Sequence, residues 1–178
     1  MLELGPAFRY DHDAQLATGG DQSALGGVYK LSAIRERGGE WQYKMKLSEQ
    51  AIKVSTPGIL QVRRYLEGGE FVADAIYDEK NGMPATSTMI DPLDPMRRKQ
   101  LPAAPVWSDL LEPIFRGGKG VSEPHTPEQA RERCRSQLGQ LHSGVKRFAN
   151  PHAYPVGLEA GLFELKQRLM LEVRGRTY

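Results

Sequence analysis

Each of two Gly-Gly pairs separates two runs of strand-like residues, and this repeated pattern is the strongest constraint on the fold. The segments are 27–37, Gly38-Gly39 and 40–48 for the first pair, and 59–67, Gly68-Gly69 and 70–77 for the second. Glycine adopts the positive φ angles that tight hairpin turns require. The pattern therefore predicts two β-hairpins, which we expect to form one small antiparallel sheet.

The return run of the first hairpin alternates large apolar residues with polar ones. Trp41, Tyr43, Met45 and Leu47 alternate with Gln42, Lys44, Lys46 and Ser48. Successive side chains of a strand point to opposite faces, so the lysines share the face that is turned away from the apolar groups.

Between residues 81 and 105, five prolines interrupt any regular element. Proline lacks a backbone donor and has a fixed φ, so we expect an extended connection with a short strand at 86–90. The basic residues 97–99 are interpreted as a solvated loop, and residues 107–115 are apolar enough to anchor against another part of the protein. The segment 117–120 (Gly-Gly-Lys-Gly) could cradle a phosphate, but the strand–loop–helix context of a P-loop is missing. A turn is the favoured interpretation.

Two helices are predicted near the C-terminus. Thr126, Pro127 and Gln129 form a helix-start signal, and Gly144 is expected to end that helix. The helical spacing of Ala130, Cys134, Leu138 and Leu141 predicts a buried stripe in which Cys134 is a packed thiol. The second helix is expected at 159–173, with Leu162, Leu165 and Leu169 facing the core, and residues 147–158 are expected to connect the two.

The predicted fold class is thus α+β: a small antiparallel sheet of two Gly-Gly hairpins plus two C-terminal helices.

Composition favours a globular protein of the cytoplasm. Apolar residues make up 39% and charged residues 26% of the 178 residues, and the formal net charge is +2. These values argue against disorder and against nucleic acid as a partner. No apolar run approaches the roughly 18 residues of a membrane helix, so we expect no membrane association. A single cysteine permits no internal disulfide and suits a reducing compartment.

Chemical signals in the sequence are sparse. The four histidines (His12, His125, His142 and His152) lack metal-ligand spacing, and no nucleophilic triad is visible. We assign no catalytic and no metal-binding residue. Lys46, Ser48 and Lys53 could offer two cations and a hydroxyl to a phosphate. Taken alone, these residues fit a solvated strand face better, because the polar faces of antiparallel strands normally meet water.

Several motifs in register resemble nicotinate phosphoribosyltransferases from about Leu16 onward. The motifs are residues 24–31 (ALGGVYKL), 46–49 (KLSE), 57–58 (PG), 146–148 (KRF) and 154–156 (YPV). The resemblance implies that residues 1–26 are a remnant of a barrel end with a degenerate phosphate loop, and that residues 27–178 are the C-terminal domain. It further implies an irregular α/β barrel packed on a sandwich-like domain, usually as a dimer.

The resemblance also implies a reaction and a role for the lysines. The family couples nicotinate to phosphoribosyl pyrophosphate, forming nicotinate mononucleotide for NAD biosynthesis, with ATP hydrolysis and Mg²⁺. Lys46, Ser48 and Lys53 match the lysine-rich strand end of the family, which implies phosphate contacts.

Departures from the family pattern leave two hypotheses open. Where the family has a Gly-Val-Gly-Thr phosphate loop, residues 11–14 read Asp-His-Asp-Ala, although Leu16 and Thr18 still match. The nicotinate pocket and the phosphorylated histidine of the family are expected upstream of Met1. The chain is then either a part of the enzyme that is inactive alone, completed by a missing N-terminal portion, or a non-catalytic remnant or assembly module. A sister enzyme for nicotinamide or quinolinate fits the motifs less well. Apolar faces beside Val28, Leu31 and Ile34 are expected to need a partner.

Overall fold

The computed structural model describes residues 29–101 and 106–175, which form two α-helices, a short 3-10 helix and ten strands. The N-terminal elements are β1 (Ala33–Ile34), β2 (Gln42–Tyr43), η1 (Ala51–Lys53), β3 (Leu60–Glu67) and β4 (Glu70–Asp78). The middle of the chain contains β5 (Thr88–Ile90), β6 (Arg98–Gln100), β7 (Val106–Asp109), β8 (Phe115–Arg116) and β9 (Lys119–Gly120). The chain continues with α2 (Pro127–Gly139), β10 (Val156–Glu159) and α3 (Ala160–Gly175). The content is mixed α/β, as the sequence predicted.

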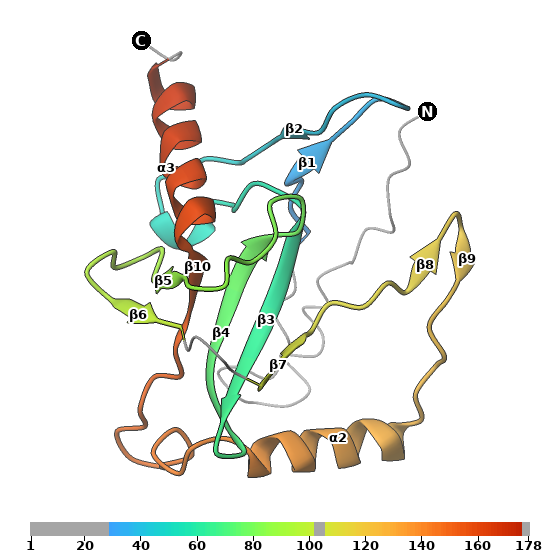
Figure 1. Cartoon of the computed structure of the whole chain (residues 1–178), viewed down its shortest axis with the longest axis vertical. Helices are drawn as coiled ribbons and strands as arrows, with labels where there is room; N and C mark the ends of the chain where they lie inside the picture. The colour runs from blue at the N-terminus through green and yellow to red at the C-terminus, as the bar shows by residue number, and fades with distance from the viewer. Residues whose placement is uncertain (1–28, 102–105, 176–178) are drawn as a thin grey trace, which may run out of the picture.

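A six-stranded sheet, in the order β6-β5-β10-β4-β3-β7, organises the molecule (Figure 1). All neighbouring strands are antiparallel except β10 and β4, which are parallel. The expectation of one antiparallel sheet built from two hairpins was therefore wrong. β3 and β4 belong to the large sheet, whereas β1 and β2 form a separate two-stranded sheet.

The hairpin of β3 and β4 has its turn at the Gly-Gly pair that the sequence indicated. Gly68 and Gly69 have φ angles of 58° and 84°, which match a tight hairpin turn with two left-handed residues. The ladder runs from Leu60 opposite Asp78 to Glu67 opposite Glu70, with an irregularity between Tyr65 and Leu66.

The first hairpin is shorter than its alternating pattern suggested. Only Ala33 opposite Tyr43 and Ile34 opposite Gln42 are paired, and the backbone of residues 44–50 is irregular. Alternation shows which side chains can share a face, but a long ladder also needs a partner strand that stays in register.

β10 lies in the middle of the sheet, although residues 147–158 were expected to be a connection. Gly157 pairs with Ala75 of β4, and Leu158 pairs with Ile76 of β4 on one side and with Ile90 of β5 on the other. Leu158 is 1% exposed. Four residues are too few to show a strand period, and a parallel partner distant in sequence leaves no local signal.

The hydrophobic core gathers around the central strands. Tyr65, Ala73, Ala75, Met89 and Leu101 form one buried cluster. α3 packs against β4, β5 and β10, with Leu162 fully buried and Leu165 and Leu169 half-buried. α3 confirms the second predicted helix, and each of its ends lies within two residues of the predicted end. Among the described residues, no helix has both the length and the apolar character needed to cross a bilayer.

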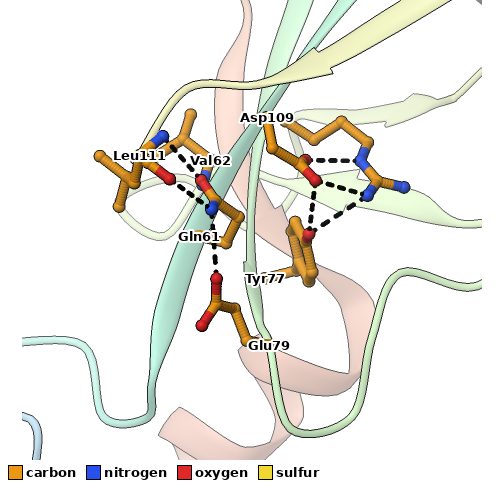
Figure 2. A network of polar contacts seen from close by, with 7 residues as sticks. Gln61, Val62, Tyr77, Glu79, Asp109 and Leu111 are labelled. Carbon is orange, nitrogen blue, oxygen red and sulfur yellow. Dashed lines mark hydrogen bonds and ion pairs between the residues drawn. The ribbon is translucent and has the colours of Figure 1, made fainter. Parts of the chain in front are cut away.

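β7 is fixed to the edge of the sheet by a compact polar network (Figure 2). Arg63 of β3 forms two hydrogen bonds with Asp109, at 2.8 and 2.9 Å, and Tyr77 donates to the same carboxylate. The Arg63 hydrogen bonds hold the pKa of Asp109 below its usual value. The Arg63 guanidinium also lies 3.6 Å from the ring centroid of Trp107. In the neighbouring cluster, Gln61 donates to Leu111 O and Glu79.

β7 provides part of the anchor that was expected at residues 107–115, but the end of that segment does not pack on the sheet. Phe115 is 71% exposed, and the β8–β9 hairpin around Gly117-Gly118 extends away from the sheet (Figure 1). The segment 97–99 is not a loop alone, because Lys99 lies in β6 and donates to Val72 O at 2.8 Å. The strand expected at 86–90 is β5.

α2 begins as predicted but is not buried. Thr126 and Gln129 form a reciprocal capping box, and Pro127 is the first helical residue. The helix ends at Gly139 rather than Gly144, Cys134 is exposed and Leu138 is 49% exposed. The prediction of a buried stripe was wrong because helical spacing shows which residues share a face, not whether another element covers it. α2 lies at the start of β4, at the opposite end of that strand from α3 (Figure 1).

The packing at β10 gives a direct test of its central position. A Cβ on Gly157 would lie 2.7 Å from both Ile90 O and Met89 Cγ. Gly157→Ala is therefore expected to lower the free energy of unfolding by about 1–3 kcal/mol through overpacking. Urea denaturation followed by circular dichroism measures this.

Gly139→Ala is the matched control, since a Cβ there would meet nothing within 4 Å. We expect the control to be unchanged or slightly stabilised. Equal stability of the wild type and Gly157→Ala would contradict the placement of β10 between β4 and β5.

Candidate functional site

The predicted phosphate-binding residues all lie on one closed loop, residues 46–56, which we call the basic loop. At its base, Lys46 N donates to Ser55 Oγ at 2.7 Å and Ser55 N donates to Lys46 O at 3.1 Å. Ser55 is 8% exposed. These reciprocal bonds join the two ends of the loop and fix its width.

The loop places its two cations in solvent. Lys46 and Lys53 are exposed, and Ser48 is half-buried. Ser48 Oγ accepts a bond from Gln50 N at 3.3 Å, which leaves its hydroxyl hydrogen available, and Lys53 ends the short helix η1. The sequence interpretation of Lys46 and Ser48 as a strand end was wrong, because β2 stops at Tyr43.

Asp78, the last residue of β4, connects the exit of the basic loop to the rest of the fold. Its carboxylate is 2% exposed and accepts hydrogen bonds from Ile59 N (3.2 Å), Lys80 N (3.2 Å), Asn81 Nδ2 (3.1 Å) and Tyr43 OH. A buried carboxylate is stable when several donors compensate its lost hydration. Burial, assisted by the Asp78 bond, raises the pKa of the Tyr43 hydroxyl to about 12.

Glu159, the last residue of β10, has a similar structural role on the adjacent strand. It is 8% exposed, and it accepts bonds from Ser87 Oγ at 3.1 Å and from Leu162 N at 3.0 Å. The second bond satisfies a free amide in the first turn of α3, where a negative charge also suits the helix dipole. Because β4 and β10 are parallel, Asp78 and Glu159 both lie where these two strands end. We call this end of the strands the carboxyl edge of the sheet.

A pocket of about 500 Å³ opens at this carboxyl edge. It is lined by Trp41, Tyr43, Asp78, Lys80, Asn81, Gly82, Pro84, Glu159, Gly161, Leu162, Leu165 and Arg168. The lining combines an indole with cations and with carboxylates that already have protein donors. Lys46, Ser48 and Lys53 are not among its lining residues, so the basic loop and the carboxyl-edge pocket are separate surfaces.

The described side chains do not fit a Mg²⁺ site. No three His, Cys, Asp or Glu side chains of this part of the chain converge as metal ligands. Both oxygens of Asp78 and both oxygens of Glu159 accept bonds from protein donors. His142 and His152 stack at 6.2 Å between ring centroids, and His142 Nδ1 accepts from Gly144 N. His12 and residues 11–18 lie outside the described residues.

Sequence reasoning missed Asp78, Glu159 and Lys166. Asp78 precedes a turn-like Glu-Lys-Asn-Gly run at the end of an apolar strand, and this position could have marked a capping carboxylate. Glu159 was taken as the first helical residue rather than the helix cap. Lys166 interrupts the leucine stripe of the second predicted helix, and that interruption was an available signal.

Comparison with solved structures defines the class of fold. The chain resembles the crystal structure of human nicotinic acid phosphoribosyltransferase, with a TM-score of 0.53 and 21% sequence identity. The match covers 92% of this chain and 32% of the human one. The chain therefore has the fold of the matching part of that structure.

Sequence comparison establishes the family. The family model for the nicotinate phosphoribosyltransferase C-terminal domain matches residues 61–166, and the chain belongs to this family. It is 32% identical over 170 residues to nicotinate phosphoribosyltransferase of Bacillus subtilis, and 29% identical over 162 residues to nicotinate phosphoribosyltransferase 2 of Arabidopsis thaliana. These matches cover 91% and 88% of this chain. The chain spans 34% and 28% of the length of the two relatives, or about a third.

The buried Tyr43–Asp78 contact predicts an unusual tyrosine titration. An unperturbed tyrosine has a pKa of about 10, whereas burial and the Asp78 bond raise the pKa of Tyr43 to about 12. The stabilisation that this raised pKa contributes is fully present below pH 10 and is lost as pH rises through the folded value. The difference in phenolate absorbance between the wild type and Tyr43→Phe should therefore stay near zero through about pH 10 and grow toward about pH 12. A difference that is complete at pH 10 would show that Tyr43 is not held by Asp78.

Proposed function

We propose that this chain supplies the C-terminal part of a nicotinate phosphoribosyltransferase, an enzyme of the cytoplasm that serves NAD biosynthesis. The whole enzyme joins nicotinate to phosphoribosyl pyrophosphate, forms nicotinate mononucleotide and releases pyrophosphate. The observation that carries the proposal is the family match over residues 61–166, which spans the chain from β3 into α3 and includes both Asp78 and Glu159.

The basic loop gives the chain a role in that reaction. Phosphoribosyl pyrophosphate presents a pyrophosphate and a 5′-phosphate, and displacement at the anomeric carbon needs cations and donors that hold these groups. Lys46 and Lys53 provide exposed ammonium groups on a loop with a fixed base, and Ser48 provides a hydroxyl. We assign phosphate contact to these three residues.

ATP and Mg²⁺ enter the proposal through the family alone. The described His, Cys, Asp and Glu side chains do not provide a ligand set for Mg²⁺. Its ligands, the nicotinate pocket and a phosphorylated histidine would come from residues outside those described. Residues 1–26 are proposed to be a remnant of the barrel end with a degenerate phosphate loop, and residues 27–178 the C-terminal domain, packed as part of a sandwich.

A non-catalytic assembly module is the second candidate, and exposed apolar side chains support it. Tyr29 is 77%, Leu31 51%, Val106 70%, Ile114 54% and Phe115 71% exposed. Side chains with this much apolar exposure suit contact with another polypeptide where they gather into one patch. The same surfaces suit the remainder of the enzyme or a second copy in a homodimer, so turnover is the property that separates the two candidates.

A chimera tests the proposed function. This chain replaces the matching third of the Bacillus subtilis enzyme, and formation of nicotinate mononucleotide from nicotinate, phosphoribosyl pyrophosphate and MgATP is measured. We expect activity in the chimera and none in the 178-residue chain alone. A folded chimera without product would favour the assembly module.

The same chimera tests the basic loop. Lys46→Ala with Lys53→Ala removes two charge-assisted contacts, so the KM for phosphoribosyl pyrophosphate is expected to rise about tenfold or more. Lys119→Ala, at an exposed lysine of β9, is the control and should leave this KM unchanged. Equal KM values for the double variant and the control would remove the loop from phosphate binding.

A further inference from the structure

Lys166 is a charged residue on the buried face of α3. It is 7% exposed and lies on the same side of the helix as Leu162 and Leu169. Lysine is almost never this buried unless its ammonium has polar partners. Its partners therefore indicate why the sequence keeps a cation at this position.

Both polar partners of the ammonium belong to the basic loop. Lys166 Nζ lies 3.3 Å from Thr56 Oγ1 and 3.4 Å from Val54 O. Within the described part of the chain, no carboxylate forms an ion pair with it. Burial lowers the pKa of the Lys166 ammonium, as expected for a charge that is poorly compensated.

A role in overall stability does not explain this arrangement. Burying an ammonium without a carboxylate partner costs free energy, and a methionine at this position would avoid that cost and continue the leucine stripe. The particular effect of lysine is to hold two oxygen atoms of the loop. Val54 and Thr56 flank Ser55, whose bonds with Lys46 close the base of the loop.

We infer that Lys166 is a positioning residue that fixes the return limb of the basic loop against α3 and so sets the place of Lys46 and Lys53. The inference rests on the proposed function for its link to phosphate binding, but not for its effect on the loop. A loop ordered before the ligand arrives loses less conformational entropy on binding. Lys166 therefore acts on the phosphates through the loop and does not touch them.

Amide hydrogen exchange of the full chain measures the positioning directly. In Lys166→Met, we expect amides of residues 46–56 to exchange up to about tenfold faster, the change that corresponds to one or two lost hydrogen bonds. Exchange in β3, β4 and β10 and the thermal midpoint should stay close to wild type.

Lys99→Met is the matched control. It removes another lysine-to-carbonyl bond, the one from Lys99 to Val72 O, on a different strand, and it should leave residues 46–56 unchanged. Unchanged exchange of the loop in Lys166→Met, or an equal acceleration in Lys99→Met, would overturn the inference.

Thr56→Val gives an independent test should Lys166→Met not fold. Valine keeps the branched shape and removes one oxygen acceptor, so a smaller acceleration confined to the loop is expected. Wild-type exchange in this variant would overturn the inference in the same way.

The chimera separates this inference from the proposed function. Lys166→Met should raise the KM for phosphoribosyl pyrophosphate and leave the KM for nicotinate unchanged. A loosened loop with an unchanged KM would support the positioning by Lys166 and contradict the phosphate role of the loop.

Discussion

The pairing of β10 between β4 and β5 is the contact on which the rest of the structure depends. It joins the C-terminal segment to the central hairpin through one parallel and one antiparallel ladder, with Leu158 buried between them. The parallel ladder brings the ends of β4 and β10 to one edge, so Asp78 and Glu159 lie there together. It also starts α3 at that edge, and this start places Lys166 against the basic loop. Gly157 permits this arrangement because its neighbours leave no room for a side chain.

The buried charges of this region organise backbone segments rather than supply a conventional stabilising ion pair. Asp78 accepts bonds from three segments that converge at the end of β4, Glu159 caps α3, and Lys166 holds the basic loop. Each charge is costly to bury, and hydrogen bonds offset that cost most fully at Asp78 and least at Lys166. The result is a loop with a fixed base and two exposed cations. This geometry suits recognition of an anionic substrate group in which most of the ordering cost is met during folding.

The parts of the fold that could be predicted from the sequence are those with local causes. Gly68-Gly69 determines its own turn, and Thr126 with Gln129 forms a capping box within four residues. The leucine spacing of α3 identified its buried side. β10 was missed because both of its partners are distant in sequence and its four residues show no period. The exposure of Cys134 was missed because a helical stripe does not reveal whether another element covers it.

For the candidate site, the sequence pointed to Lys46, Ser48 and Lys53, whose place on one loop is now defined. Asp78 and Lys166 were missed because their roles follow from long-range contacts.

We propose that the C-terminal domain presents the basic loop to the phosphate groups of the substrate. Two-dimensional amide NMR of the isotope-labelled chain, titrated with pyrophosphate, tests this role. We expect saturable shifts that centre on the amides of residues 46–53, weaken with added salt, and leave the glycine-rich turn at 117–120 unmoved. Saturable shifts confined to that turn, to the His142–His152 region or to the carboxyl-edge pocket would contradict it, as would the absence of any saturable shift in a folded chain.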